Sequence, residues 1–313
     1  MEGVTDYAFR FLQAKHFAAA DKYYTPFISP TATHKLTEKQ LRELAPENNA
    51  GIRLVPQLIG HDAEDFLWAA EEIKAMGYSE INFNLGCPSG TVVSKKKGSG
   101  LLSEREMLTK FFDEVFEKTP VAVSVKTRIG RLGTEEFSAL LELFSAYPIS
   151  ELIIHPRLQT QQYKGTPHLP AWEAAQREDK RPLCYNGDLF TAQKVEAFLS
   201  AYPQTQSIML GRGLAADPAL IGELRNGVKA KKSEIKAFHD ELLEVTNARI
   251  GQDRPVLMHM KELWFYLACS FVNSEKPLKG IKKAQSIADY RAAVEALFNS
   301  CELREDAGFH LSK

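Results

Sequence analysis

The sequence predicts an α/β protein, a (β/α)8 TIM barrel followed by a small all-α helical bundle. Short apolar segments recur about every thirty residues along the first two-thirds of the chain, and helical patterns lie between them. Strands that alternate with helices form a parallel sheet. No Gly-x-Gly-x-x-Gly turn of the doubly wound alternative follows any of these segments, so a barrel fits better.

The predicted strands are short runs of apolar or β-branched residues bounded by polar or glycine-containing turns. They are residues 23–25, 52–58, 81–84, 121–126, 152–155, 183–186 and 208–210. Helices, with apolar residues three and four positions apart, are predicted at residues 61–76, 104–116, 135–144, 192–199 and 218–224. These are seven strands, whereas a closed barrel of this type has eight. The missing strand, the first, would precede Met1.

The strand pattern stops after Arg225. Residues 226–233 form a polar, basic connector, in which Ser233 is suited to cap the next helix. We therefore expect a barrel domain over residues 1–232 and a helical domain over residues 233–313. Its helices are predicted at residues 235–250, 256–271 and 287–298.

The composition is that of a globular protein: 313 residues, 44% hydrophobic and 25% charged. No apolar run is long enough for a membrane span, and Met1-Glu2-Gly3 opens without a signal segment, so we expect a cytoplasmic protein. Four cysteines lie far apart with no Cys-x-x-Cys pair. This spacing favours reduced thiols over a metal cage or a disulfide framework.

The net charge of −1 provides no overall attraction to nucleic acid, so an RNA partner would need local basic patches. One candidate is a run of lysines between the second and third C-terminal helices: Lys276, Lys279, Lys282 and Lys283. Taken alone, such a run is more often a solvated loop than a phosphate-binding patch. Because the run lies next to a predicted barrel domain, a phosphate-binding patch becomes more nearly as good an interpretation as a solvated loop.

Cys87 lies at the point where a predicted strand ends. Ile81 and Phe83 alternate with polar residues, and Gly86 and Pro88 then turn the chain out of the sheet on either side of the thiol. A buried packing cysteine and a functional thiol at a loop surface are equally good interpretations of this segment alone.

Polar residues end the other predicted strands as well. Gln57, Asn84, Lys126, Arg128 and His155 all follow apolar runs. Each alone is better explained as a strand-end or surface residue, but barrel enzymes build their sites where the strands end, and together they predict such a site.

Two glycine-containing turns follow the last strands. They are Asn186-Gly187-Asp188 and Gly211-Arg212-Gly213. Backbone N–H groups in such turns bind anions in barrels, and Arg212 adds a charge. A phosphate-bearing cofactor is therefore expected here.

Seven sequence blocks together resemble the tRNA-dihydrouridine synthases of bacteria. They are residues 1–6 (Met-Glu-Gly-Val-Thr-Asp), 56–60 (Pro-Gln-Leu-Ile-Gly), 82–88 (Asn-Phe-Asn-Leu-Gly-Cys-Pro), 125–128 (Val-Lys-Thr-Arg), 155–157 (His-Pro-Arg), 186–188 and 211–213. The resemblance covers nearly the whole chain. It implies an FMN-binding barrel, a helical domain that grips tRNA, and reduction of the C5=C6 bond of particular uridines with NADPH as electron donor.

The resemblance also implies roles for residues at matching positions. Those that would bind FMN are Met1, Glu2, Gly3, Gln57, Lys126, His155, Asn186, Gly187, Asp188, Gly211 and Arg212. Asn84 and Arg128 would bind a uracil flipped out of the RNA. Cys87 would be the acid: hydride added at C6 leaves negative charge toward C5, where a proton donor is needed, and thiols are mostly protonated at neutral pH.

Two alternative functions are compatible with parts of this pattern. An FMN-dependent small-molecule dehydrogenase of the dihydroorotate type, or an ene-reductase, would share the phosphate turns but would not need a lysine-bearing helical domain. A non-catalytic RNA-binding descendant would not retain the cysteine and the flavin contacts. We therefore expect an enzyme that binds tRNA and NADPH, acts as a monomer, and holds no metal.

Members of this family carry a hydrophobic strand ending in Ala-Pro before the block that starts at Met1. We therefore expect that the natural protein begins roughly ten residues upstream, since an open barrel would leave strand edges unpaired.

Overall fold

The computed structural model describes residues 1–310 and contains a ring of parallel strands. These are β1 (Tyr23–Tyr24), β2 (Leu54–Val55), β3 (Gln57–Leu58), β4 (Glu80–Leu85), β5 (Ala122–Arg128), β6 (Leu152–His155), β7 (Leu183–Tyr185) and β8 (Ser207–Ile208). Strands β2 and β3 form one predicted strand interrupted at Pro56, so all seven predicted strands are confirmed. The strands follow chain order within two sheets, a two-stranded sheet of β1 and β2 and a six-stranded sheet from β3 to β8. Within residues 1–310, β8 pairs with β7 and no other strand.

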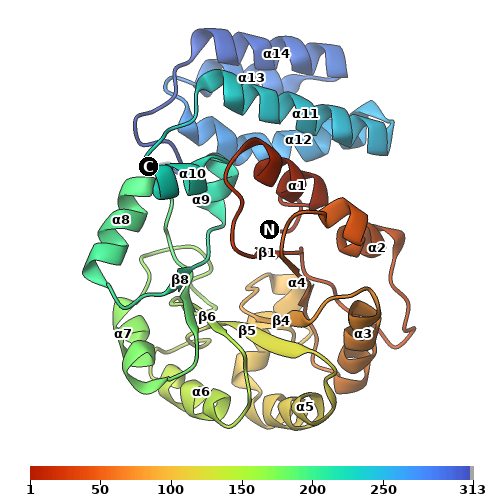
Figure 1. Cartoon of the computed structure of the whole chain (residues 1–313), viewed down its shortest axis with the longest axis vertical. Helices are drawn as coiled ribbons and strands as arrows, with labels where there is room; N and C mark the ends of the chain where they lie inside the picture. The colour runs from red at the N-terminus through yellow and green to blue at the C-terminus, as the bar shows by residue number, and fades with distance from the viewer. Residues whose placement is uncertain (311–313) are drawn as a thin grey trace.

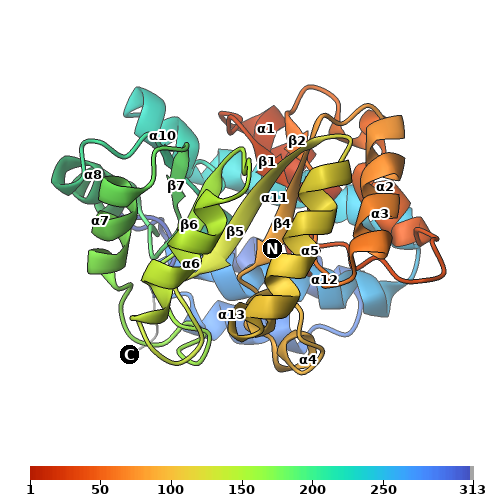
Figure 2. The same ribbon diagram turned by 90° about the horizontal axis from the view of Figure 1, so that it is seen from below.

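Helices surround this ring (Figure 1, Figure 2). The five predicted ones are confirmed as α3 (Ala63–Ala75), α5 (Arg105–Lys118), α6 (Glu136–Ser145), α8 (Ala192–Ala201) and α10 (Leu220–Asn226). Unpredicted ones are α2 (Glu38–Leu44), α4 (Gly90–Val93), α7 (Leu169–Glu178) and α9 (Arg212–Ala216). Most of these are one or two turns long, which is too short for an apolar period to be recognised.

The alternation along β4 separates an apolar outer face from a polar inner face. Ile81, Phe83 and Leu85 are fully buried against the surrounding helices. The Phe83 ring centroid lies 5.4 Å from that of Phe66 in α3 and 4.7 Å from that of Phe111 in α5. The intervening residues therefore point into the ring, because successive side chains of a strand face opposite ways.

The helical part lies at one side of the barrel, next to α1 (Tyr7–His16), α9 and α10 (Figure 1). It comprises α11 (Lys232–Ile250), α12 (Asp253–Leu267), the short 3-10 helix η3 (Ala268–Ser270), α13 (Glu275–Lys283) and α14 (Ile287–Ser300). The three predicted helices are confirmed, but the cap is not Ser233, which lies in the first turn. Lys231 is the N-cap, and the Glu234 carboxylate accepts its backbone N–H at 2.7 Å.

The lysine run expected as a loop is instead α13. Pro277 lies in the first turn, where a backbone N–H would have no helical partner, so it does not break the helix. A Cβ on Gly280 would lie 3.4 Å from Ala293 Cβ, so the glycine allows α13 to approach α14 closely. The prediction of a loop was wrong because it relied on the run of lysines alone, which does not reveal how this segment packs against α14.

Helix α1 (Tyr7–His16) packs between the barrel and the helical part. Phe9 meets Phe238 of α11 edge-on at 5.5 Å. Asp6, the N-cap of α1, accepts a hydrogen bond from Arg249 of α11 at 2.7 Å. On the other side, Gln13 Nε2 donates to the Pro218 carbonyl at 2.9 Å. The N-terminal helix therefore joins the two parts of the molecule.

A buried hydrogen-bond network lies inside the helical part. Tyr290 Oη accepts a hydrogen bond from Trp264 Nε1 and lies 2.7 Å from His239 Nε2. The Tyr290 hydroxyl proton is therefore directed at His239 Nε2, which leaves the imidazole proton on Nδ1, 3.0 Å from Asp240 Oδ1. Burial lowers the pKa of His239, in keeping with this neutral form.

We expect Tyr290→Phe to lower the free energy of unfolding by about 2–4 kcal/mol, because it leaves a buried indole N–H and a buried imidazole nitrogen without partners. The matched control is Tyr202→Phe, which removes a hydroxyl bonded at 2.8 Å to the exposed Glu173 and should cost little. Denaturation of both variants with urea provides the measurement. Equal losses would show that the network contributes nothing beyond a surface contact.

Candidate active site

Amides form a connected set inside the barrel. Gln57 Nε2 donates to Asn82 Oδ1 at 2.8 Å, and Asn82 Nδ2 donates to Ser124 Oγ at 3.0 Å. Asn84 Nδ2 donates to Gln57 Oε1 at 2.7 Å. All four residues are buried. Because each amide forms a hydrogen bond with the next side chain of the set, Gln57 and Asn84 are held in single orientations at the carboxyl end of the strands.

The loop that carries Cys87 is fixed from both sides. Asn84 Oδ1 accepts the backbone N–H groups of Gly86 and Cys87, each at 2.9 Å. The Cys87 carbonyl accepts hydrogen bonds from Ser99 N at 3.1 Å and Ser99 Oγ at 2.8 Å. The residue is half-buried, and all four cysteines are free thiols. Cys87 therefore lies at a surface, in a backbone that its neighbours hold rigid.

Two cations follow from β5 into the same space. Lys126 Nζ has no hydrogen-bond partner among residues 1–310, and a Cβ on Gly86 would lie 3.6 Å from it. Arg128 is anchored, since its Nε donates to the Gly86 carbonyl at 2.9 Å and its Nη1 to the Leu158 carbonyl at 2.8 Å. Burial, and next the charge of Arg128, lowers the pKa of Lys126 to about 8. Burial lowers the pKa of Arg128 to about 10.

Arg157 is also part of the site, although the sequence block 155–157 indicated no role for it. It is fully buried and forms a bidentate pair with Asp188, with Nη1–Oδ1 at 2.7 Å and Nη2–Oδ2 at 2.5 Å. Its Nη1 also lies 3.3 Å from His155 Nε2. Burial and four neighbouring cations hold the pKa of His155 well below its usual value. His155 is therefore a neutral imidazole here.

Asn186, Gly187 and Asp188 form the first predicted phosphate turn. Asn186 Nδ2 donates to the Met209 carbonyl at 2.8 Å. A Cβ on Gly187 would lie 2.8 Å from Tyr185 Oη, so only glycine fits. Asp188 has a positive φ of 43°. Its carboxylate is occupied by arginines, which suits a role in orienting them, because a carboxylate repels phosphate.

Arg212 and Gly211 belong to the second turn. Arg212 Nη2 donates to Asp188 Oδ1 at 3.1 Å. A Cβ on Gly211 would lie 3.5 Å from Met1 Sδ, so the first residue contacts this turn. Gly3, with φ of 77°, lies against Glu262 of α12, and Glu2 accepts a hydrogen bond from Lys39 at the surface. The structure thus brings Met1, but not the Glu2 side chain, to the predicted phosphate turns.

Tyr163 was not predicted. Its ring is 53% exposed and lies 5.5 Å from the guanidinium carbon of Arg128 and 4.8 Å from that of Arg212. It belongs to the long loop after β6, and no periodic pattern marks a single aromatic residue in a loop. Only its position close after the block 155–157 could have indicated it.

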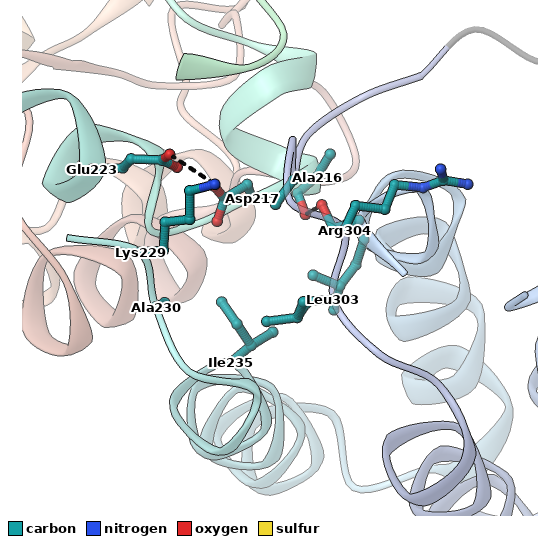
Figure 3. Close-up of a pocket in the computed structure, with 11 residues that line it drawn as sticks. Ala216, Asp217, Glu223, Lys229, Ala230, Ile235, Leu303 and Arg304 are labelled. Atoms are coloured by element: carbon teal, nitrogen blue, oxygen red, sulfur yellow. Dashed lines mark hydrogen bonds and ion pairs between the residues drawn. The ribbon is translucent and has the colours of Figure 1, made fainter. Parts of the chain in front are cut away.

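A pocket of about 90 Å³ lies elsewhere, between the barrel and the helical part (Figure 3). Asp217, Lys229 and Arg304 are among the residues that line it. None of the predicted site residues does. The candidate active site is therefore the carboxyl end of the strands, where Cys87 and the cations converge, and not this pocket.

A family model described as dihydrouridine synthase (Dus) matches residues 1–298. The chain belongs to the dihydrouridine synthase family. It is 27% identical over 314 residues to the tRNA-dihydrouridine synthase B of Serratia marcescens, covering 98% of this chain and 92% of that one. It is 26% identical over 264 residues to the tRNA-dihydrouridine synthase B of Pasteurella multocida, covering 84% and 75%.

A solved structure of an old yellow enzyme homologue from Zymomonas mobilis is similar in fold. Its TM-score is 0.50 at 12% identity, over 75% of this chain and 87% of that one. Together, these comparisons confirm the predicted family, the α/β barrel with a helical C-terminal part, and the class of enzyme, a flavin-dependent oxidoreductase that forms dihydrouridine. No helix formed by residues 1–310 has the length and apolar content needed to span a bilayer.

The site residues fit a flavin. The half-buried Lys126 ammonium, which has no hydrogen-bond partner among residues 1–310, suits the edge of a ring that becomes anionic on reduction. Gly86 keeps the space beside it open. The Arg212 guanidinium beside the two glycine turns suits a phosphate.

Lys126 should destabilise the flavin-free protein at neutral pH. Because its folded pKa of about 8 lies below the ordinary lysine value of 10.5, the folded protein binds fewer protons than the unfolded chain between these values. Stability from this group therefore rises with pH through that window. We expect Lys126→Met to raise the free energy of unfolding at pH 7 by about 1–3 kcal/mol, and by less above pH 10.

Denaturation of flavin-free protein at pH 7 and pH 10 measures this effect. The control is Lys110→Met, whose side chain is 81% exposed and should change little at either pH. A Lys126→Met variant that is less stable than the parent at pH 7 would contradict the buried-charge explanation.

Proposed function

We propose that this protein reduces the C5=C6 bond of specific uridines in tRNA, with bound FMN, NADPH as electron donor and Cys87 as the proton donor. One observation carries the proposal: a rigidly held, half-buried thiol lies at the strand end beside a cluster of cations, which includes a lysine without a hydrogen-bond partner in residues 1–310. The names of the relatives from Serratia marcescens and Pasteurella multocida support tRNA as substrate.

Bound FMN would supply the hydride that is added at C6 of the uracil. Negative charge then develops toward C5 and O4, and the Cys87 thiol donates the proton to C5. Asn84 and Ser99 keep the thiol in place by binding the backbone on either side of it. Arg128, whose Nη2 is not engaged by the carbonyls of Gly86 and Leu158, binds the uracil carbonyl.

The remaining predicted residues would hold the cofactor. Gln57 would contact the pyrimidine edge of the flavin, and Lys126 would lie near N1 and O2. The phosphate would be bound at the two turns by Asn186, Gly187, Gly211 and Arg212, with Asp188 orienting the arginines. His155, being neutral, is suited to the ribityl side. The monomeric state, the cytoplasmic location and the roles of Met1, Glu2 and Gly3 stay predictions.

Cys87→Ala tests the acid role. We expect dihydrouridine formation to fall about 100- to 10,000-fold, because the variant lacks only the proton donor. Flavin content and oxidation of NADPH should remain, as judged from the absorbance of the purified protein and from NADPH consumption. Single-turnover reduction of unmodified tRNA provides the measurement, and undiminished turnover would exclude Cys87 as the acid.

Lys126→Met is the matched comparison. It should weaken both flavin retention and flavin reduction by NADPH, because it removes the charge beside the ring. Identical behaviour of the two variants would argue against this division of roles between thiol and ammonium.

The helical domain, proposed at residues 233–313, would bind the RNA. Lys276, Lys279 and Lys283 lie on α13, at spacings of three and four, and are all exposed. A helix presents such residues on one side, as a phosphate-binding surface requires. The small-molecule alternative offers no reason for this arrangement.

We expect the triple variant Lys276→Ala, Lys279→Ala, Lys283→Ala to flatten the salt dependence of tRNA binding. The slope of log K against log salt should fall by about 0.7 to 0.9 for each lost phosphate contact. Lys110→Ala and Lys118→Ala on α5 provide the control, with side chains 81% and 60% exposed. A slope equal to that of the parent protein would assign the α13 lysines to a solvated face.

A further inference from the structure

The segment that follows α14 returns from the helical part to the barrel. Leu303 forms an antiparallel bridge with Phe271, and Arg304 N donates to the Ser270 carbonyl at 2.9 Å. Gly308 N then donates to Ser270 Oγ at 2.8 Å. Phe309 N donates to the Phe190 carbonyl, in the loop between β7 and α8, at 3.3 Å. The segment thus ends beside the predicted phosphate turns.

Gly308 makes this close approach possible. Its φ is 143°, a conformation that L side chains rarely adopt, and a Cβ would overlap the Phe190 carbonyl oxygen. The backbone therefore lies directly on the loop that precedes α8, with no space for another residue type.

Phe309 is placed by this contact against Arg212. The ring is 6% exposed, and its centroid lies 5.2 Å from the guanidinium carbon. The rings of Phe190 and Tyr163 lie 4.7 and 4.8 Å from the same carbon. Aromatic faces attract a guanidinium without occupying its N–H groups. Among residues 1–310, Asp188 is the only hydrogen-bond acceptor of Arg212, so its remaining donors stay available.

We propose that Phe309 is a positioning residue for Arg212, and that the C-terminal segment holds this arginine ready for the phosphate of the flavin. The inference rests on the proposed function, in which Arg212 binds that phosphate. A guanidinium that is already fixed loses less conformational entropy when the anion binds, so the affinity for the phosphate-bearing cofactor increases. Phe309 should not change the affinity for the rest of the flavin, because Arg212 contacts only the phosphate in this proposal.

The experiment compares FMN with riboflavin, which lacks the phosphate, by quenching of flavin fluorescence in flavin-free protein. We expect Phe309→Ala to raise the Kd for FMN about 2- to 30-fold and to leave the Kd for riboflavin unchanged. Phe309→Leu, which keeps most of the apolar volume, should behave like Phe309→Ala, whereas Phe309→Tyr should restore the affinity. The control Phe265→Ala removes a neighbouring ring that is 59% exposed and 6.3 Å from Phe309, and it should change neither Kd.

A double-mutant cycle completes the test. In the Arg212→Ala background, Phe309→Ala should have no further effect on FMN, because the group it positions is gone. Equal losses for FMN and riboflavin, full affinity in Phe309→Leu, or a persistent loss in the Arg212→Ala background would overturn the inference. If the parent protein binds neither flavin, both the proposed function and this inference are wrong. If both flavins bind and the ratio of their two Kd values in Phe309→Ala equals that of the parent protein, only this inference is wrong.

Discussion

The structure depends on an accumulation of positive charge at the carboxyl end of the barrel. Lys126, Arg128, Arg157 and Arg212 converge there, and the Asp188 carboxylate pairs with two of them, Arg157 and Arg212. Burial first, and then repulsion between like charges, lowers the pKa values of Lys126 and Arg128. Such a site is most favourable when it holds an anion. A phosphate group and an anionic reduced ring both meet that requirement.

The barrel can tolerate these charges because the outer face of its strands provides the hydrophobic packing that stabilises the fold, while the inner face carries the polar groups of the site. The outer face of the strands carries the aromatic core, with Phe83 packed between Phe66 and Phe111. The inner face can then be polar, provided that its groups satisfy one another, as Gln57, Asn82 and Asn84 do. Lys126 is the exception, since its half-buried ammonium has no hydrogen-bond partner within the described residues 1–310, and a polar group left without a partner in an ordered site is characteristic of function.

Strand positions and strand-end residues were predictable because they depend on local alternation and on a single rule for parallel barrels. The rule that barrel enzymes build their sites at the carboxyl ends of the strands predicts that Cys87, Lys126 and Arg128 lie close together. What could not be predicted depends on contacts between distant segments. Arg157 became part of the site only through its pair with Asp188, thirty-one positions away. Its residue type offered no sign that it would be fully buried.

Local rules also failed where tertiary packing overrode them. The run of lysines indicated a loop, yet α13 forms, since Pro277 falls in the first turn and Gly280 fits against Ala293. Ser233 is a good capping residue, but the helix begins earlier because Glu234 satisfies the N–H of Lys231. In each case the local residues are compatible with more than one structure, and contacts with other parts of the chain decide which one forms.

The two ends of the chain give the molecule its particular geometry. Helix α1 contacts α11 through Phe9 and the barrel through Gln13, while Gly308 and Phe309 return from the helical part to the loop before α8. Two connections at different places restrict rotation of one part against the other more than a single linker can. Under the proposed function, in which the helical domain binds tRNA and Cys87 donates the proton, a helical domain free to rotate would present different uridines to Cys87. The contacts of α1 and of residues 303–309 would then contribute to the choice of uridine, alongside the residues that touch RNA.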